Sequence, residues 1–293
     1  MSQEKKNPLD FALWKKAKEG EPYWDSPWGK GRPGWHIECS VMAKTLLGDT
    51  IDIHAGGEDL QFPHHENEIA QSETLTGKPF ANYWLHNGML TIDNRKMSKS
   101  LGNFFTVREI GEEFDLEVLR FFLLSAHYRN PINFNREVME QLENGLERLY
   151  NTKKNLEYLL DMAEDSKVEN GEINKINKFK DEFIKSMEDD LNTADAIASL
   201  FDISKYANTN FNEKTSKFVI QYTYNTFMEL ANILGLLYKE EEILEEEILE
   251  LIEKRTQARK EKNYQLADKI RDDLKNKGII LEDTQEGVKW KRI

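Results

Sequence analysis

Residues 50–77 constrain the fold more than any other stretch, because they predict a strand, a turn and a helix in direct succession. Residues 50–54 alternate between polar and apolar side chains as a half-buried strand does, and Ala55-Gly56-Gly57 predicts a turn. The helix is expected to open at Pro63 and to have ended by Gly77. In open α/β sheets this order places ligand-binding groups at the carboxyl ends of the strands. We therefore expect a Rossmann-like α/β region with parallel strands.

Residue types that bind metals gather around this helix. His64 and Glu68 stand four residues apart, so their side chains leave the same face of a helix. Cys39, the single cysteine, would complete a Cys/His/Glu set of the kind that zinc accepts. The alternatives are a polar helix face with a hydrogen-bonded histidine, and an inert core cysteine. The run from His65 also begins like the zinc helix of a metalloprotease, but the second histidine of that motif is absent, so this interpretation fails.

A lysine-rich segment follows at Lys96-Met97-Ser98-Lys99-Ser100. Lys96 and Lys99 in a loop can close on a polyphosphate and neutralise the charge that gathers on a departing pyrophosphate. A charged surface turn is the ordinary alternative. Residues 82–92 alternate and carry aromatics, which predicts a half-buried hairpin just upstream. The lysine loop would then follow the end of a strand, which is where nucleotide sites form.

These motifs occur in one order, and together residues 34–100 resemble the second half of the catalytic domain of the cysteinyl-tRNA synthetases. That family belongs to the class I aminoacyl-tRNA synthetases. The resemblance extends to residue 103 and is carried by four runs, GWHIECS at 34–40, DIHAGG at 52–57, FPHHENEIAQ at 62–71 and KMSKSLGN at 96–103.

The resemblance implies a zinc site that selects the amino acid. Cys39, His64 and Glu68 correspond to three of the four protein ligands of a catalytic zinc ion, one per chain, and Trp35 to the tryptophan that floors the cysteine pocket. Zinc would bind the thiolate of the substrate at about 2.3 Å, a bond that a serine hydroxyl cannot match.

The resemblance also implies an ATP site. Asp59, after the two glycines, matches the acidic residue at the adenosine ribose, and Lys99 matches the loop lysine that contacts ATP, with Lys96 beside it. His54 and Gly56 are expected to contact ATP from the same side. The implied activity is activation of cysteine with ATP and Mg²⁺, followed by transfer to tRNA(Cys).

The chain departs from the family pattern in one respect. The fourth zinc ligand of the family is a cysteine near the N-terminus, followed by a His-Ile-Gly-His-type motif, and neither occurs in these 293 residues. We therefore expect a family member that lacks its N-terminal part, is inactive alone and is completed by a separate N-terminal fragment. One alternative is a non-catalytic zinc- and tRNA-binding fragment or subunit. Another is a cysteine ligase that joins the adenylate to an amino sugar, but such relatives lack a terminal module like residues 240–293.

The remainder of the chain predicts helices. Residues 104–134 are expected to form connecting helices that contact the tRNA stem, after a catalytic part at 1–103. An apolar stripe that includes Leu146 and Leu149 predicts long amphipathic helices over 135–240 that pack as a tRNA-binding bundle, with a loop over 165–174. Gly48 is expected to end a helix, and Asp115 and Thr193 to cap helices. Residues 241–293 predict two helices and a hairpin, which resemble the small anticodon-binding module of the family. Near the N-terminus, residues 8–15 predict one or two helical turns.

In the hairpin, Trp290 lies among cations that include Arg292, a combination suited to unstacked RNA bases. A tryptophan that anchors the hairpin to the helices is the alternative. The net charge of -13 argues against bulk attraction to nucleic acid, so any tRNA must use local basic patches.

Composition bears on the compartment. One cysteine excludes an internal disulfide framework and fits a reducing cytosol. There is no apolar run of the length of a membrane span and no signal-peptide core. We therefore expect a cytoplasmic protein without a membrane partner.

Overall fold

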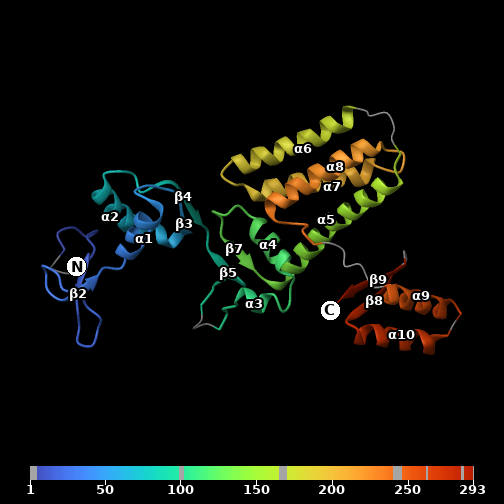
Figure 1. Ribbon diagram of the computed structural model, residues 1–293, viewed down its shortest axis with the longest axis horizontal. Coiled ribbons are helices and arrows are strands. Elements are labelled where there is room, and N and C mark those ends of the chain that lie inside the picture. Colours follow the sequence, from blue (N-terminus) through green and yellow to red (C-terminus); the bar gives the residue numbers. More distant parts are fainter. Residues whose placement is uncertain are drawn as a thin grey trace. The chain divides into compact units, whose positions relative to one another are not determined.

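The computed structural model describes residues 5–98, 102–164, 170–239, 246–261, 263–284 and 287–292 (Figure 1). Lys99 lies outside the described residues. The chain divides into two compact units, Met1–Leu237 and Tyr238–Ile293. None of the helices in the described part of the chain is long and apolar enough to cross a membrane.

The N-terminal segment is a small antiparallel ribbon. Strand β1 (Trp14–Lys16) pairs with β2 (Gly31–Pro33). The helical turns expected over residues 8–15 are wrong. Leu9 and Leu13 are exposed, so no apolar face is packed to hold a short helix together.

The α/β region is built around one parallel strand pair. Helix α1 (Ile37–Leu47) ends at Gly48 and leads into β3 (Ile51–Gly57). The chain then passes through the short helices η1 (Glu58–Leu60) and η2 (Gln61–His65) and through α2 (Glu66–Thr76). It returns as β4 (Ala81–Asn87), which pairs with β3 in parallel. The predicted α/β fold with parallel strands is confirmed.

The glycine turn expected at residues 55–57 is wrong. Gly56 and Gly57 continue β3 and lie in register with His86 and Asn87 of β4, so the chain turns only in η1. The end of α2 agrees with the prediction, because Gly77 adopts the left-handed conformation that closes helices (φ 68°).

The hairpin expected over residues 82–92 is also wrong, because β4 and the following strand belong to different sheets. Strand β5 (Leu90–Ile92) pairs antiparallel with β6 (Arg95–Lys96) and parallel with β7 (Ile132–Phe134). The turn between β5 and β6 falls at Asp93 and Asn94, whose positive φ angles of 49° and 59° suit a tight hairpin.

Two short helices follow the lysine loop, as predicted. Helix α3 (Val107–Ile110) carries a capping box between Thr106 and Glu109. Helix α4 (Leu116–Leu124) is capped by Asp115, whose side chain accepts a hydrogen bond from the Glu117 backbone N–H.

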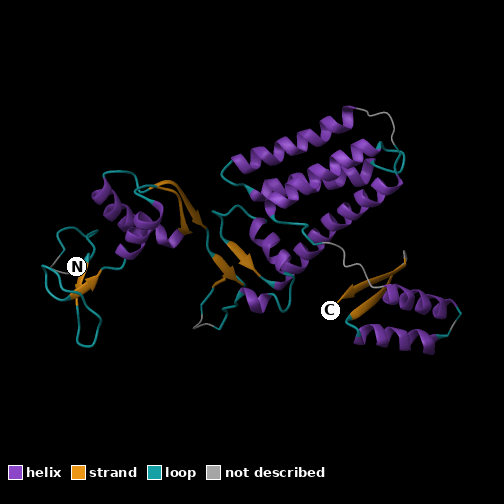
Figure 2. Ribbon diagram, in the orientation of Figure 1, coloured by secondary structure: helices purple, strands orange, loops and turns teal. Residues whose placement is uncertain are grey.

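A helical bundle makes the largest core of the molecule (Figure 2). It consists of α5 (Arg136–Met162), α6 (Asn170–Glu188), α7 (Thr193–Asn210) and α8 (Lys217–Leu234), and α4 packs against it. Helix α6 begins at Asn170, inside the loop predicted over residues 165–174, of which 165–169 are not described. Asn192 caps α7, whereas Thr193, the expected cap, donates its hydroxyl to the Leu124 carbonyl.

The second unit has the predicted helix-helix-hairpin pattern. It contains α9 (Glu246–Lys260), α10 (Tyr264–Asn276) and the antiparallel strands β8 (Ile279–Thr284) and β9 (Gly287–Arg292). Ile270, Leu274 and Ile279 belong to its buried core. Trp290 and Arg292 lie on β9, in register with Leu281 and Ile279, but their side chains are outside the described part of the structure.

Candidate metal and nucleotide site

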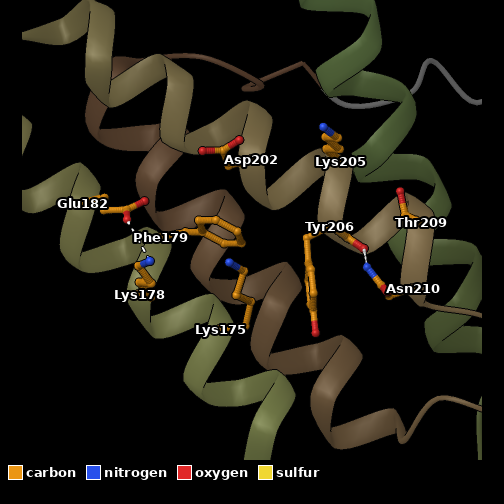
Figure 3. Close-up of a pocket in the computed structure, with 9 residues that line it drawn as sticks. All are labelled: Lys175, Lys178, Phe179, Glu182, Asp202, Lys205, Tyr206, Thr209 and Asn210. Atoms are coloured by element: carbon orange, nitrogen blue, oxygen red, sulfur yellow. Dashed lines mark hydrogen bonds and ion pairs between the residues drawn. The ribbon is translucent and has the colours of Figure 1, made fainter.

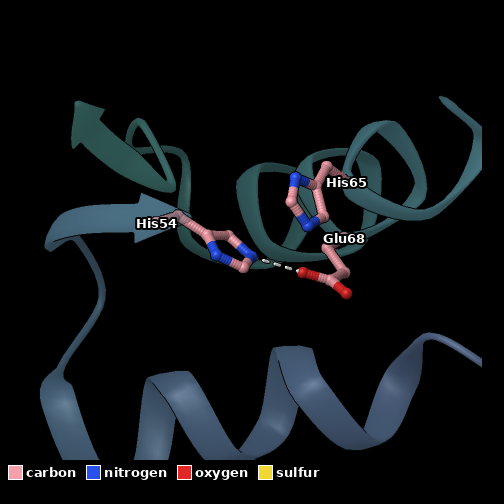
Figure 4. A group of neighbouring side chains, drawn as sticks. All are labelled: His54, His65 and Glu68. Atoms are coloured by element: carbon pink, nitrogen blue, oxygen red, sulfur yellow. Dashed lines mark hydrogen bonds and ion pairs between the residues drawn. The ribbon is translucent and has the colours of Figure 1, made fainter. Parts of the chain in front are cut away.

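The buried carboxylate of Glu68 is the centre of the site. Glu68 lies in the first turn of α2 and is only 5% exposed. Its Oε2 atom is 2.7 Å from Nε2 of His54, which comes from β3 (Figure 4). A carboxylate oxygen only accepts, so the imidazole donates this hydrogen bond.

A stack of aromatic rings surrounds His54. Its ring centroid lies 4.4 Å from that of His65 and 4.8 Å from that of Trp84, and Phe80 meets it edge-on at 5.4 Å. His65 Nδ1 lies 2.9 Å from His86 Nε2. Burial lowers the pKa of His65, and the neighbouring His54 lowers it further. The His65 imidazole therefore favours its neutral form, which is the form that binds metals.

The register of the parallel strands explains this stack. His54 lies opposite Trp84 and Gly56 lies opposite His86, so side chains from β3 and β4 meet on one face. A Cβ atom on Gly56 would lie 2.9 Å from Cε1 of His65, which is too close for a real contact. Glycine at this position therefore lets the His65 ring approach the strand.

Cys39 reaches Glu68 from the opposite helix. It is the third residue of α1, and its thiol lies near the Glu68 carboxylate. Partial burial raises the pKa of Cys39, and the neighbouring Glu68 carboxylate raises it further, although the residue is exposed overall. Helices α1 and α2 thus bring a sulfur and a carboxylate together.

His64 faces a second buried histidine. Its ring centroid lies 5.0 Å from that of His36, the residue before α1. Burial lowers the pKa of His36, and His64 lowers it further. Nδ1 of His36 is buried and has no hydrogen-bond partner among the described residues. A buried nitrogen without a partner is costly, so it points to a missing ligand or water.

The donor chemistry of the site fits zinc. Thiol, imidazole and carboxylate are the ligand types that zinc takes, and the orphaned nitrogen of His36 shows unsatisfied polarity at the same place. By distance alone, His54, His65 and Glu68 form the compact group, with donor atoms all within 4.8 Å of one another. Glu68 belongs both to this group and to the predicted set of Cys39, His64 and Glu68. The predicted set stays a prediction.

The remaining predicted site residues in the described part of the chain lie on or beside different elements. Trp35 is 72% exposed just before α1. Asp59 lies exposed on η1, and a Cβ on Gly57 would lie 2.5 Å from its Oδ1. Lys96 is exposed on β6. Asn103 ties the two sides of the lysine loop, because its side chain accepts from the Ser98 N–H at 2.9 Å and donates to the Lys96 carbonyl at 3.1 Å.

Sequence reasoning missed three histidines of this site. His36, His65 and His86 carry no spacing signal of their own, because they meet through the strand register and the packing of α1 against α2. The available signal was the density of histidines between residues 36 and 86.

A hollow of about 440 Å³ lies between α6 and α7 in the bundle (Figure 3). Lysines and acids both face it. Lys178 Nζ lies 3.8 Å from Glu182, and Lys175 Nζ lies 4.7 Å from the ring centroid of Phe179. Glu182 and Asp202 offset much of the lysine charge, so this hollow is not a basic patch.

Comparisons with protein families indicate the class of protein. Residues 1–144 match the family of class I (C) tRNA synthetase catalytic domains, and residues 182–238 match the DALR domain family. The chain therefore combines a class I tRNA synthetase catalytic-domain region with a DALR domain. A solved LeuRS from Agrobacterium radiobacter, in a ternary complex with tRNA and LeuAMS, shares the fold. It has a TM-score of 0.59 and 16% identity, and the match covers 76% of this chain and 32% of that chain.

Another relative is more similar to this chain in sequence than the LeuRS is. The chain is 54% identical over 297 aligned residues to the cysteine–tRNA ligase of Clostridioides difficile, covering 100% of this chain and 64% of that protein. It is thus a homologue of cysteine–tRNA ligase that spans less than two thirds of the length of this relative.

Proposed function

We propose that the chain supplies the zinc-bearing and lysine-loop-bearing part of a cysteine–tRNA ligase, which activates cysteine with ATP and transfers it to tRNA(Cys). The observation that carries this proposal is the nearness of the Cys39 thiol to the buried Glu68 carboxylate, which helps to raise the pKa of the thiol. It brings a soft sulfur ligand to a buried carboxylate beside the end of a parallel strand, in a homologue of cysteine–tRNA ligase.

Zinc would be held by Cys39, His64 and Glu68, three protein ligands of the types that catalytic zinc sites use. When bound, the ion supplies a strong bond to the thiolate of the substrate, which separates cysteine from serine. Trp35, exposed beside α1, would form the floor of the cysteine pocket.

ATP with Mg²⁺ would bind at the carboxyl end of β3. Gly56 and Asp59 lie there, and His54 was expected to join them. Lys96 and Lys99 would approach the phosphates from the lysine loop, where a compact cation offsets the charge of departing pyrophosphate. Residues 1–103 would thus carry the chemistry.

The rest of the chain would hold tRNA(Cys). We assign residues 104–134 to the tRNA stem, 135–240 to the body of the tRNA and 241–293 to the anticodon, with Trp290 and Arg292 as contacts. A free thiol at Cys39 suits the reducing cytoplasm.

The open strand pair supports a further partner. Parallel sheets are normally covered on both faces, but β3 and β4 form a two-stranded sheet among the described residues. Ile53 and Tyr83 of these strands are 61% and 69% exposed. An N-terminal α/β fragment, carrying the second cysteine and the His-Ile-Gly-His-type motif, would cover this face and complete the site.

The test is zinc content and cysteine-dependent ATP–pyrophosphate exchange, measured with and without the N-terminal fragment of the Clostridioides difficile relative. We expect zinc in the chain alone, and exchange only when the fragment is added. Cys39→Ala and His64→Ala should lose both zinc and cysteine binding, whereas Lys99→Ala should slow exchange and keep cysteine affinity.

Two outcomes would contradict the proposal in different ways. Unchanged zinc and cysteine binding in Cys39→Ala would remove the metal assignment. Binding of tRNA(Cys) without exchange, even with the fragment, would favour a non-catalytic zinc- and tRNA-binding subunit. The match of residues 182–238 to a DALR domain favours a tRNA substrate over an amino sugar.

A further inference from the structure

The position of the His54 side chain differs from the one expected for an ATP contact. The family resemblance places it at ATP, but its Nε2 atom is directed at Glu68 and lies 2.7 Å from Oε2 (Figure 4). Because Nε2 donates this bond, the proton of a neutral His54 ring sits on Nε2. The Glu68 side chain is more deeply buried than that of His54, so the histidine is the partner that satisfies it.

The His54 ring is held in place by its neighbours. Trp84 is its register partner across the parallel pair, with ring planes inclined at 34°, and His65 covers it at 30°. Phe80 closes the edge at an angle of 89°. With three rings around it, the imidazole has little freedom to leave the carboxylate.

The hydrogen bond engages one oxygen of Glu68. The carboxylate is approached from β3 by His54 and from α1 by Cys39, so its two sides face different partners. Figure 4 shows the second oxygen pointing away from His54. A carboxylate fixed through one oxygen presents the other in a defined direction.

We propose that His54 is a positioning residue that holds Oε2 of Glu68, so that this carboxylate binds the zinc ion through its other oxygen only. This inference rests on the proposed function and deepens it. Partners that hydrogen-bond a metal-ligating carboxylate orient it and tune the affinity of the site.

The test uses the 293-residue chain and zinc alone, titrated against a chromophoric chelator, with urea unfolding measured on each variant. We expect His54→Ala to weaken zinc binding by about 10- to 100-fold. His54→Gln should recover most of the affinity, because the glutamine amide nitrogen can donate from near the Nε2 position. His86→Ala is the matched control, since His86 joins the same ring stack through His65 and Trp84 but forms no hydrogen bond with Glu68 in the described part of the chain.

Cobalt loading gives a second readout that folding alone does not move. Added cysteine should strengthen the sulfur-to-cobalt charge-transfer band in the parent and in His54→Gln, and much less in His54→Ala. A His54→Ala variant with the zinc affinity of the parent would overturn the inference, and so would a folded His54→Gln as weak as His54→Ala. Equal loss in His86→Ala would reassign the effect to the ring stack. A parent that takes up no zinc would refute the metal site itself and this inference with it.

Discussion

Glu68 on α2 and Glu117 on α4 are both buried glutamates, 5% and 1% exposed, but their partners differ. Glu117 accepts from the Leu237 backbone N–H at 2.6 Å and from the Tyr150 hydroxyl at 2.8 Å, so both of its oxygens are used inside the bundle. Glu68 accepts a ring N–H from His54 and lies near the Cys39 thiol, and both neighbours are residue types that also bind metals. The Glu117 carboxylate therefore links α4 to other parts of the fold. The Glu68 carboxylate instead lies among side chains that could bind a metal with it.

The two regions around these glutamates differ in the same way. The bundle buries a large apolar core, and its Thr152 and Ser204 hydroxyls bond each other at 2.6 Å. The α/β region buries a small cluster around Ile51, and at its site His36 Nδ1 and Gln71 Nε2 are buried without partners among the described residues. In the bundle, Glu117, Thr152 and Ser204 are satisfied within the chain, although the buried Thr223 hydroxyl has no hydrogen-bond partner in the part of the chain that the structure describes. In the α/β region, His36 and Gln71 leave these buried nitrogens unsatisfied where we place the metal.

The strongest test of this contrast is Glu117→Ala. It leaves the Leu237 N–H and the Tyr150 hydroxyl without that acceptor, and each such loss costs 1–3 kcal/mol, so the free energy of unfolding should fall by about 3 kcal/mol. Urea unfolding measures this change, with the exposed Glu112→Ala as control. Zinc affinity should stay at the parent value. A stability loss no larger than that of the control would show that Glu117 does not anchor α4.

Glu68→Gln is expected to lower zinc affinity strongly and stability only a little, the opposite of Glu117→Ala. The amide oxygen can still accept from His54, but the charged metal ligand is lost, so zinc affinity should fall by about 100-fold or more. Stability of the metal-free chain should change less than in Glu117→Ala. Chelator competition measures the affinity, and the exposed Glu66→Gln on the same helix is the control. If Glu68→Gln binds zinc as the parent does, the contrast between the two glutamates fails.

A smaller effect is expected within the bundle from Thr152→Val. The Thr152 hydroxyl contacts the Ser204 hydroxyl at 2.6 Å and the Asn208 side-chain amide at 2.9 Å. Its removal leaves the buried Ser204 hydroxyl poorly satisfied, which should lower the free energy of unfolding by about 1.5 kcal/mol. Thr209→Val, at an exposed position of α7, is the matched control for urea unfolding. Equal stability of the two variants would weaken the view that the bundle depends on satisfied polar pairs.

The smallest effect concerns Tyr224 and depends on pH. Burial raises the pKa of Tyr224 to about 12, and its hydrogen bond to Glu157 also raises it. The folded pKa lies above the unfolded value of about 10, so the protonated hydroxyl stabilises the fold. This contribution is fully present below pH 10 and is lost as pH rises through about 12.

Tyr224→Phe should therefore lower the free energy of unfolding by about 1 kcal/mol at pH 8. The difference between variant and parent should shrink as the pH is raised from 10 toward 12. Parallel unfolding series on both chains measure it, and zinc affinity at pH 8 should be unchanged. A difference that grows with pH would contradict the direction of the pKa shift.

Local signals predicted much of the fold. Glycine at 48 and at 77, and Asp115 before α4, mark helix ends in the sequence and do so in the structure. The stripe through Leu146 and Leu149 predicted the buried face of α5. These features depend on neighbours a few residues apart, which a sequence displays directly.

Pairings between distant segments were not predictable in the same way. The strand at Leu90–Ile92 pairs with Ile132–Phe134, some forty residues away, and no local pattern selects that partner over β4. The ring stack at the site has the same origin, because His65 and His86 meet only through the parallel register. The resemblance to a family predicted Cys39, His64 and Glu68 as metal ligands. The hydrogen bond between His54 and Glu68 depends on the tertiary structure, so the sequence did not predict it.

The uncovered face of β3 and β4 has a consequence for the chain in solution. Ile53 and Tyr83 lie on neighbouring strands whose outer edges pair with no third strand among the described residues. Exposed apolar surface beside unpaired strand edges is a template for self-association. We expect light scattering to rise with protein concentration, and to rise less when a partner covers this face.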